Sequence, residues 1–225
     1  MKIRFSDLVL YEDNHLLVTF KPAGVLSQKD KSKDLSMVDY AKEYLKEKYQ
    51  KPGDAYVGLV HRLDRMTEGV LVLTKTSKAA ARLSEDIKNN LWDKTYLCLV
   101  HGELTDDGRL TDYVEHIDSS KKMQICKVGT GQIAKLRYEI LGKFKKTTLL
   151  KVKLETGRHH QIRVQMANFN HPIVGDHLYG KKEHCDLMLA CTKISFKHPT
   201  LDKIVEFEAQ PRSAKWNKYL KGINA

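Results

Sequence analysis

Short apolar runs, separated by polar or glycine-containing turns, follow one another along most of the chain. Apolar runs of about four to eight residues between such turns are typical of buried strands. A Gly129-Thr130-Gly131 sequence is typical of a hairpin turn. The pattern predicts strands at Leu8–Tyr11, Leu16–Phe20, Tyr56–Val60, Val70–Leu73, Tyr96–Val100, Ala134–Leu141, Thr147–Leu154, Leu187–Phe196 and Lys203–Ala209.

Helical spacing of apolar residues predicts fewer helices than strands. Ser36 is expected to cap a helix over Met37–Tyr49, because a serine hydroxyl accepts hydrogen bonds from first-turn amides. In a later helix His159 and Arg163 are expected to share one face, four residues apart. His160 would then point to another face than His159, which makes the pair a poor metal site. The remaining helices are predicted at Ser77–Leu91, His159–Asn168 and Ala214–Leu220.

Strands that outnumber helices and are often consecutive favour an α+β protein with a mainly antiparallel, mixed β-sheet core flanked by helices and loops. The sequence contains no repeat, low-complexity segment or evident linker. A length of 225 residues suits one large domain or two small ones. We therefore expect a single domain over residues 1–225.

Charge indicates the kind of partner. Lys and Arg outnumber Asp and Glu by 39 to 28, which gives a net charge of +11. A strongly basic protein favours a polyanion, with nucleic acid as the first candidate, although basic proteins without that role exist. The four cysteines form no C-x-x-C pair, so neither a zinc knuckle nor a redox motif is indicated. No signal peptide or membrane-length apolar run is evident, so we expect a cytoplasmic protein without membrane contact.

One acidic residue stands out among basic neighbours. Asp64 lies between Arg62 and Arg65, in a segment that joins two predicted strands. Neighbouring positive charge favours the ionised form of a carboxylate, which suits a nucleophile or a base. From these residues alone, a charged turn in which Asp64 only pairs with arginine is an equally good interpretation.

Five segments in order resemble motifs of one family. The sequence HRLDRMTEGVLVLTK resembles the catalytic motif of the RluA-type pseudouridine synthases, and VLYEDNHLLVTFKPAGVLS resembles their opening hairpin. The segments KTYLCLVHG, TGRHHQIRVQMA and HPIVGDHLYG resemble their later motifs. The resemblance extends from about Asp7 to Pro211. It implies the pseudouridine synthase catalytic fold without the N-terminal S4 RNA-binding module, so that the catalytic domain itself would read the substrate.

The resemblance implies an isomerase that converts specific uridines of ribosomal or transfer RNA to pseudouridine, with no cofactor and no metal. Asp64 matches the family's catalytic Asp, which could attack C1′ or remove a proton from C2′. Tyr96 matches a tyrosine expected to stack on uracil and assist at C5. Arg163 matches an arginine expected to pair with Asp64. Arg62 matches a residue expected to occupy the base stack when the target flips out.

Alternatives accompany these assignments. Tyr96 could be a core aromatic, Arg163 a surface arginine and Arg62 a salt-bridge partner. Glu68 stands where the family more often has Ser, and we expect it to add negative charge near the RNA path. A monomer without a protein partner is expected; an RNA-binding chaperone or assembly factor with idle catalysis is the alternative function. The substrate-binding candidates are Arg62, Arg65, Thr67 and His61, although a histidine there more often orients a turn.

Overall fold

The computed structural model describes residues 3–117, 122–181, 183 and 185–221. The chain divides into two compact units, the first made of residues 1–92 and 191–211, the second of residues 93–190 and 212–225. Each unit is described by itself, and the expected single domain stays a prediction. Of the helices in the part of the chain described, none is long and apolar enough to cross a membrane.

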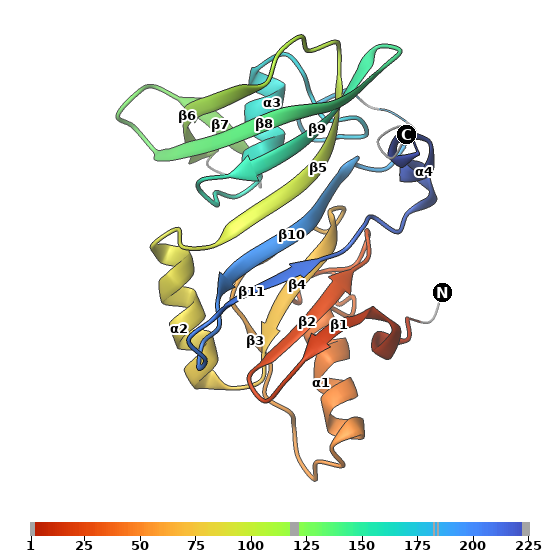
Figure 1. Cartoon of the computed structure of the whole chain (residues 1–225), viewed down its shortest axis with the longest axis vertical. Helices are drawn as coiled ribbons and strands as arrows, with labels where there is room; N and C mark the ends of the chain where they lie inside the picture. Colours follow the sequence, from red (N-terminus) through yellow and green to blue (C-terminus); the bar gives the residue numbers. More distant parts are fainter. Residues whose placement is uncertain (1–2, 118–121, 182, 184, 222–225) are drawn as a thin grey trace. The chain divides into compact units, whose positions relative to one another are not determined.

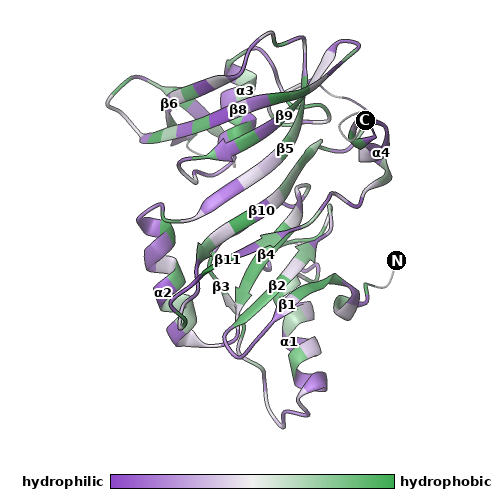
Figure 2. Ribbon diagram, in the orientation of Figure 1, coloured by the Kyte–Doolittle hydropathy of each residue, from purple (hydrophilic) through white to green (hydrophobic). Residues whose placement is uncertain are grey.

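In the first unit the strands follow the order β1-β2-β4-β10, and β3 and β11 pair with β4 and β10 (Figure 1). Every residue of β2 and β4 is buried, and Figure 2 colours most of both strands as hydrophobic. Continuous apolar sequence therefore predicted both central strands correctly. The strands are β1 (Val9–Glu12), β2 (Leu16–Lys21), β3 (Gly58–Leu59), β4 (Glu68–Thr74), most of β10 (Leu189–Lys197) and β11 (Ile204–Glu208).

Two α-helices and a 3-10 turn complete the first unit: η1 (Phe5–Leu8), α1 (Met37–Lys48) and α2 (Ser77–Lys88). The predicted cap is confirmed, because the Ser36 hydroxyl accepts from the Asp39 amide while the Asp39 carboxylate accepts from the Ser36 amide. Helix α2 packs on β3 and β4. Helix α2 therefore covers the two strands that bracket the Asp64 segment.

In the second unit the strand order is β5-β9-β8-β6-β7. Along β8 buried and exposed residues largely alternate, as expected for a sheet with one wet face, and Figure 2 shows the alternation as changing colour. The helix α3 packs against β6 and β7. The elements are β5 (Asp93–His101), β6 (Gly108–His116), β7 (Met123–Cys126), β8 (Gln132–Phe144), β9 (Thr147–Leu154), α3 (Gln161–Asn168), η2 (Ala214–Trp216) and α4 (Asn217–Leu220).

The α+β class and the antiparallel pairing are confirmed, since each strand pair whose register is known here runs antiparallel. Three local predictions differ. The strand expected over Tyr56–Val60 is only the two residues of β3, because Tyr56 is 46% exposed and precedes the pairing. The turn at residues 129–131 forms, but β7 pairs with β6 and not with β8. Strand β6 was missed because Val114 is its one buried residue.

Helix α3 begins two residues later than predicted. His160 has left-handed backbone angles (φ 50°, ψ 22°), so helical geometry starts only at Gln161. His159 therefore lies outside the helix, and the expected shared helical face of His159 and Arg163 is wrong. This irregular start decides how the two histidine rings are arranged.

Candidate active site

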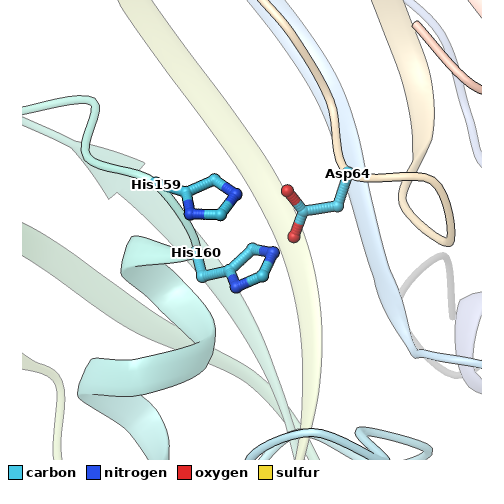
Figure 3. Close-up of side chains that lie close together, drawn as sticks. All are labelled: Asp64, His159 and His160. Atoms are coloured by element: carbon cyan, nitrogen blue, oxygen red, sulfur yellow. The ribbon is translucent and has the colours of Figure 1, made fainter. Parts of the chain in front are cut away.

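Asp64 lies in the loop between β3 and β4, and Figure 3 shows its carboxylate projecting away from the loop backbone. The side chain is partly exposed. The Asp64 carbonyl oxygen accepts a hydrogen bond from the Thr67 amide at 3.0 Å, which closes a tight turn. The carboxylate is thus presented at a turn whose backbone is closed on itself.

Ser27 fixes the residue before Asp64. Its hydroxyl donates to the Leu63 carbonyl oxygen at 2.8 Å and accepts from the Leu63 amide at 3.1 Å. Ser27 and Leu63 are both only 5% exposed. Buried backbone groups require partners, and here one side chain satisfies both groups of the same residue.

Lys21 fixes the residue after Asp64. Its ammonium donates to three carbonyl oxygens, those of Pro22 at 3.0 Å, Val25 at 2.7 Å and Arg65 at 2.9 Å. Lys21 is 0% exposed, and this burial lowers its pKa to about 7, although the negative charge of Asp64 acts in the opposite direction. A buried amine thus holds the turn and interacts with its carboxylate.

Arg65 is engaged within the first unit. Its guanidinium donates to the Gly24 carbonyl at 3.0 Å and to the Asp34 carboxylate at 2.7 Å, while its own carbonyl accepts from the Gly24 amide at 2.8 Å. Arg62 is exposed, which leaves it accessible to a ligand. The substrate-binding roles of Arg62 and Arg65 stay predictions.

His61 and Thr67 belong to the support of the loop. Nε2 of His61 accepts a hydrogen bond from the Val72 amide at 2.9 Å, which continues the bonding along β4 beyond the end of β3. The His61 ring also stands edge-on to Trp92 at 5.4 Å. Thr67 is only 2% exposed. The structure therefore favours orienting the turn as the function of His61, and substrate binding by either residue stays a prediction.

The structure shows the surroundings of Glu68 and explains why residue 69 is a glycine. Glu68 is 1% exposed, so its carboxylate is not presented on the surface, and its charge acts on buried Lys21. Its effect near an RNA path stays a prediction. Gly69 has a φ of +125°, and a Cβ there would collide with the carbonyl oxygen of Cys191. Only glycine fits at this point of the motif.

Arg163 in α3 makes a two-pronged ion pair with Asp176. Its Nε and one terminal nitrogen each lie 2.8 Å from a different carboxylate oxygen. The side chain of Arg163 is 12% exposed and that of Asp176 is 0% exposed, so the alternative of a surface arginine is wrong. The expected pairing of Arg163 with Asp64 would join the two units and stays a prediction.

Asp176 is itself fixed from several sides. Its carboxylate also accepts from the amides of Leu178 at 2.9 Å and Tyr179 at 3.1 Å. Burial alone would raise the pKa of Asp176, but the hydrogen bonds and charge of Arg163, with these amides, lower it below its usual value. The carboxylate is therefore ionised at neutral pH and holds the guanidinium in one orientation.

Tyr96 and the two histidines occupy the second unit as well. Tyr96 lies on β5, opposite Val152 of β9, and is 8% exposed. A tyrosine this buried could be a core aromatic residue or could stack on the uracil, so its role stays a prediction. The rings of His159 and His160 stack with a centroid distance of 3.9 Å. Figure 3 shows the two rings lying side by side, so they do not diverge as expected. The cause is the left-handed conformation of His160.

Three supporting residues were not identified from the sequence. Lys21 and Ser27 belong to the opening-hairpin segment, and Asp176 belongs to the HPIVGDHLYG segment. Each lies in a segment that resembles a family motif, and its position in that segment is the one sign in the sequence that it could support the site. Their contacts with Leu63, Arg65 and Arg163 are too distant in sequence for any periodicity to reveal.

Comparisons with known proteins identify the family. A family model described as RNA pseudouridylate synthase matches residues 15–168. A ribosomal large subunit pseudouridine synthase D of Yersinia pestis is 36% identical over 173 residues, which cover 76% of this chain and 52% of that protein. An uncharacterized RNA pseudouridine synthase of Mycoplasma genitalium is 32% identical over 224 residues, which cover 96% of this chain and 70% of that protein.

Among solved structures, human RNA pseudouridylate synthase domain containing 4 superposes with a TM-score of 0.79. The superposition covers 98% of this chain and 94% of the human chain, at 20% sequence identity. The likeness is therefore one of fold. The chain spans about half the length of the Yersinia pestis relative.

Proposed function

Because this chain belongs to the RNA pseudouridylate synthase family, as its RluA-type motifs indicated, we propose that it isomerises uridine to pseudouridine in RNA with Asp64 as the catalytic carboxylate. The observation that carries the proposal is the fixed turn around Asp64. Ser27 holds the preceding residue and Lys21 holds the following one. A carboxylate fixed on both sides and still partly exposed is prepared to meet a substrate.

The reaction rearranges bonds within one nucleotide. The C1′–N1 bond of uridine breaks, the uracil turns, and a new C1′–C5 bond forms. C5 then loses its proton and N1 gains one, so atoms and electrons balance without an oxidant or an added group. Asp64 either attacks C1′ and later leaves, or removes a proton from C2′ to form a glycal and returns that proton to C2′ when C5 bonds to C1′. Both routes need an ionised carboxylate at this position.

Four further residues take part in the proposed mechanism. Arg163 pairs with Asp64 and keeps it charged, while Asp176 fixes the guanidinium. Tyr96 stacks on the target uracil and assists at C5. Arg62, which is exposed, takes the place of the target base in the RNA stack, because a flat guanidinium can stack and also meet phosphate.

Large-subunit ribosomal RNA is the substrate that we propose. The relatives that support it are named ribosomal large subunit pseudouridine synthases D and C. The net charge of +11 suits an RNA partner, and transfer RNA is the alternative substrate. We further propose that the chain works in the cytoplasm as a monomer without a protein partner.

Replacing one carboxylate oxygen tests this function. Asp64→Asn keeps the size of the side chain and removes its charge, so we expect pseudouridine formation to fall by at least about a thousandfold. The assay incubates purified protein with ribosomal RNA from cells that lack the gene and maps pseudouridine. Asp34→Asn, which removes an exposed carboxylate beside Arg65, is the matched control and should keep most activity.

An RNA chaperone with idle catalysis is the competing function. It predicts that the Asp64→Asn gene restores every growth and ribosome-assembly defect of a deletion strain. The proposed enzyme predicts that the modification stays absent in that strain. If pseudouridine forms normally with the Asn variant, Asp64 is not the catalytic group.

A further inference from the structure

A column of three imidazole rings in the second unit connects the β6–β7 hairpin with the start of α3. The ring of His116 stacks on His159 with a centroid distance of 5.4 Å and an interplanar angle of 27°. His159 in turn stacks on His160 at 3.9 Å and 24°. Nearly parallel rings at these distances form favourable stacked contacts.

Hydrogen bonds hold the inner end of the column. Nδ1 of His160 lies 2.9 Å from the Tyr179 hydroxyl oxygen, which accepts from the Met123 amide at 2.8 Å. Met123 is the register partner of His116 on the neighbouring strand. The contacts therefore lead from His116 through the other two rings and Tyr179 to Met123, the residue that pairs with His116 on the neighbouring strand. Rings fixed in advance lose little freedom when a ligand binds.

The outer end of the column is accessible. His116 is the last residue of β6 and is exposed, while His159 and His160 are partly buried. One further planar group can therefore extend the stack beyond His116. Proteins bind unpaired RNA bases by stacking them on aromatic side chains, histidine included. A net charge of +11 favours RNA over an uncharged planar ligand.

We propose that His116 is a stacking subsite for a nucleobase next to the target uridine. The inference rests on the proposed function, in which the target uracil itself stacks on Tyr96. Because Tyr96 already holds the target uracil in that function, a base stacked on His116, at the outer end of the column, belongs to a flanking nucleotide.

Binding to short RNA tests the subsite without turnover. The Asp64→Asn protein serves as background, and the probe is a labelled single-stranded RNA of about 12 nucleotides with one central uridine. Adding His116→Ala should weaken binding about tenfold, because one base loses its stacking partner. His116→Phe should restore the affinity, since phenylalanine keeps an aromatic face.

Two abasic probes locate the base. One lacks the base on the 5′ side of the uridine and the other lacks it on the 3′ side. On one of these probes His116→Ala should have no effect, while on the other it should still weaken binding about tenfold. The dependence of affinity on salt should keep its slope, because stacking releases no counterions. Lys127→Ala, in the turn after β7, is the control: it should act equally on all probes.

Several results would overturn the subsite. One is a Phe variant as weak as the Ala variant, and another is an equal effect of His116→Ala on both abasic probes. A salt slope reduced by about one would mean a phosphate contact and not stacking. Failure of the proposed function is a separate result: the protein with Asp64 intact would form no pseudouridine, whatever the binding data on the Asn background.

Discussion

The Asp64 turn and the start of α3 are held in place by different chemistry. Around Asp64 the partners are backbone groups: the amide and carbonyl of Leu63, and the carbonyl of Arg65, bonded by Ser27 and Lys21. At α3 the partners are side chains, since Arg163 is held by the carboxylate of Asp176. The first arrangement fixes the path of the chain, whereas the second fixes one charged group.

The comparison suggests different sensitivities to mutation. A bond to a backbone carbonyl does not depend on the side chain at that position, so Arg65 could be replaced without loss of the Lys21 contact. A pair of side chains depends on both residues. We therefore expect the loss of one member of the α3 pair to have the largest effect on both stability and the reaction, and changes beneath the Asp64 turn to have smaller effects on both.

Among the residues that hold these two regions in place, the largest effect is expected from Asp176→Ala. Removing one member of a buried ion pair leaves Arg163 without its two-pronged partner, at a cost of about 3–5 kcal/mol in unfolding free energy. Misplacement of the guanidinium should lower kcat about a hundredfold with a smaller change in KM. Steady-state kinetics and chemical denaturation measure both quantities.

The control for Asp176 is Glu139→Ala, which removes an exposed ion pair with Lys151 in the same unit. Such pairs contribute at most about 1 kcal/mol, so stability and kcat should change little. Asp176→Asn keeps an oxygen that accepts from the amides of Leu178 and Tyr179 but removes the negative charge. This variant therefore distinguishes the effect of lost charge on kcat from the effect of impaired folding. A normal kcat in the Asn variant would contradict the positioning role.

An intermediate effect is expected from Lys21→Met. The change leaves three partly buried carbonyl oxygens without their donor, so the unfolding free energy at pH 7 should fall by about 2 kcal/mol. The difference between the two proteins should also depend on pH. The pKa of Lys21 is about 7 when folded and ordinarily 10.5.

Between these two pKa values, the unfolded chain keeps a proton on Lys21 that the folded chain has released. Raising the pH from 7 to 10 therefore favours the folded wild type over its unfolded state, and the stability gap to the Met variant should widen. Urea denaturation of both proteins across this range measures the gap. A constant or shrinking gap would mean that Lys21 keeps its proton in the folded protein.

The smallest effect is expected from Ser27→Ala. The variant leaves the amide and carbonyl of Leu63 unpaired, which should lower the unfolding free energy by about 1–2 kcal/mol. The activity should fall less than tenfold, because Lys21 still holds the other side of the turn. Ser32→Ala, in an exposed loop, is the control. A loss of activity as large as that of Asp176→Ala would reverse the ranking of the two regions.

Elements with a strong local pattern were predictable from the sequence. The apolar runs of β2 and β4 and the Ser36 cap need only near neighbours to form. Strand β6 was missed because its place depends on backbone pairing with β8 and β7, which leaves no apolar pattern. The start of α3 was misjudged because nothing local reveals the left-handed turn at His160.

The candidate site was also only partly predictable from the sequence. Asp64, Tyr96 and Arg163 were identified through resemblance, but the contacts that hold them connect residues far apart in sequence. Ser27 bonds Leu63 from 36 positions away, and Lys21 bonds Arg65 from 44. Glu68 looked like a surface charge, and only the fold reveals that it is buried beside Lys21.

The burial of Lys21 also gives the molecule an internal reporter. Reagents that acylate amines react with solvent-exposed lysines, whereas the Lys21 amine is enclosed and committed to three oxygens. It becomes reactive only when the segment around residues 22–25 and 65 separates from β2. Acylation at this one position, followed by mass spectrometry of the peptides, would therefore record how often the Asp64 turn opens while the rest of the protein stays folded.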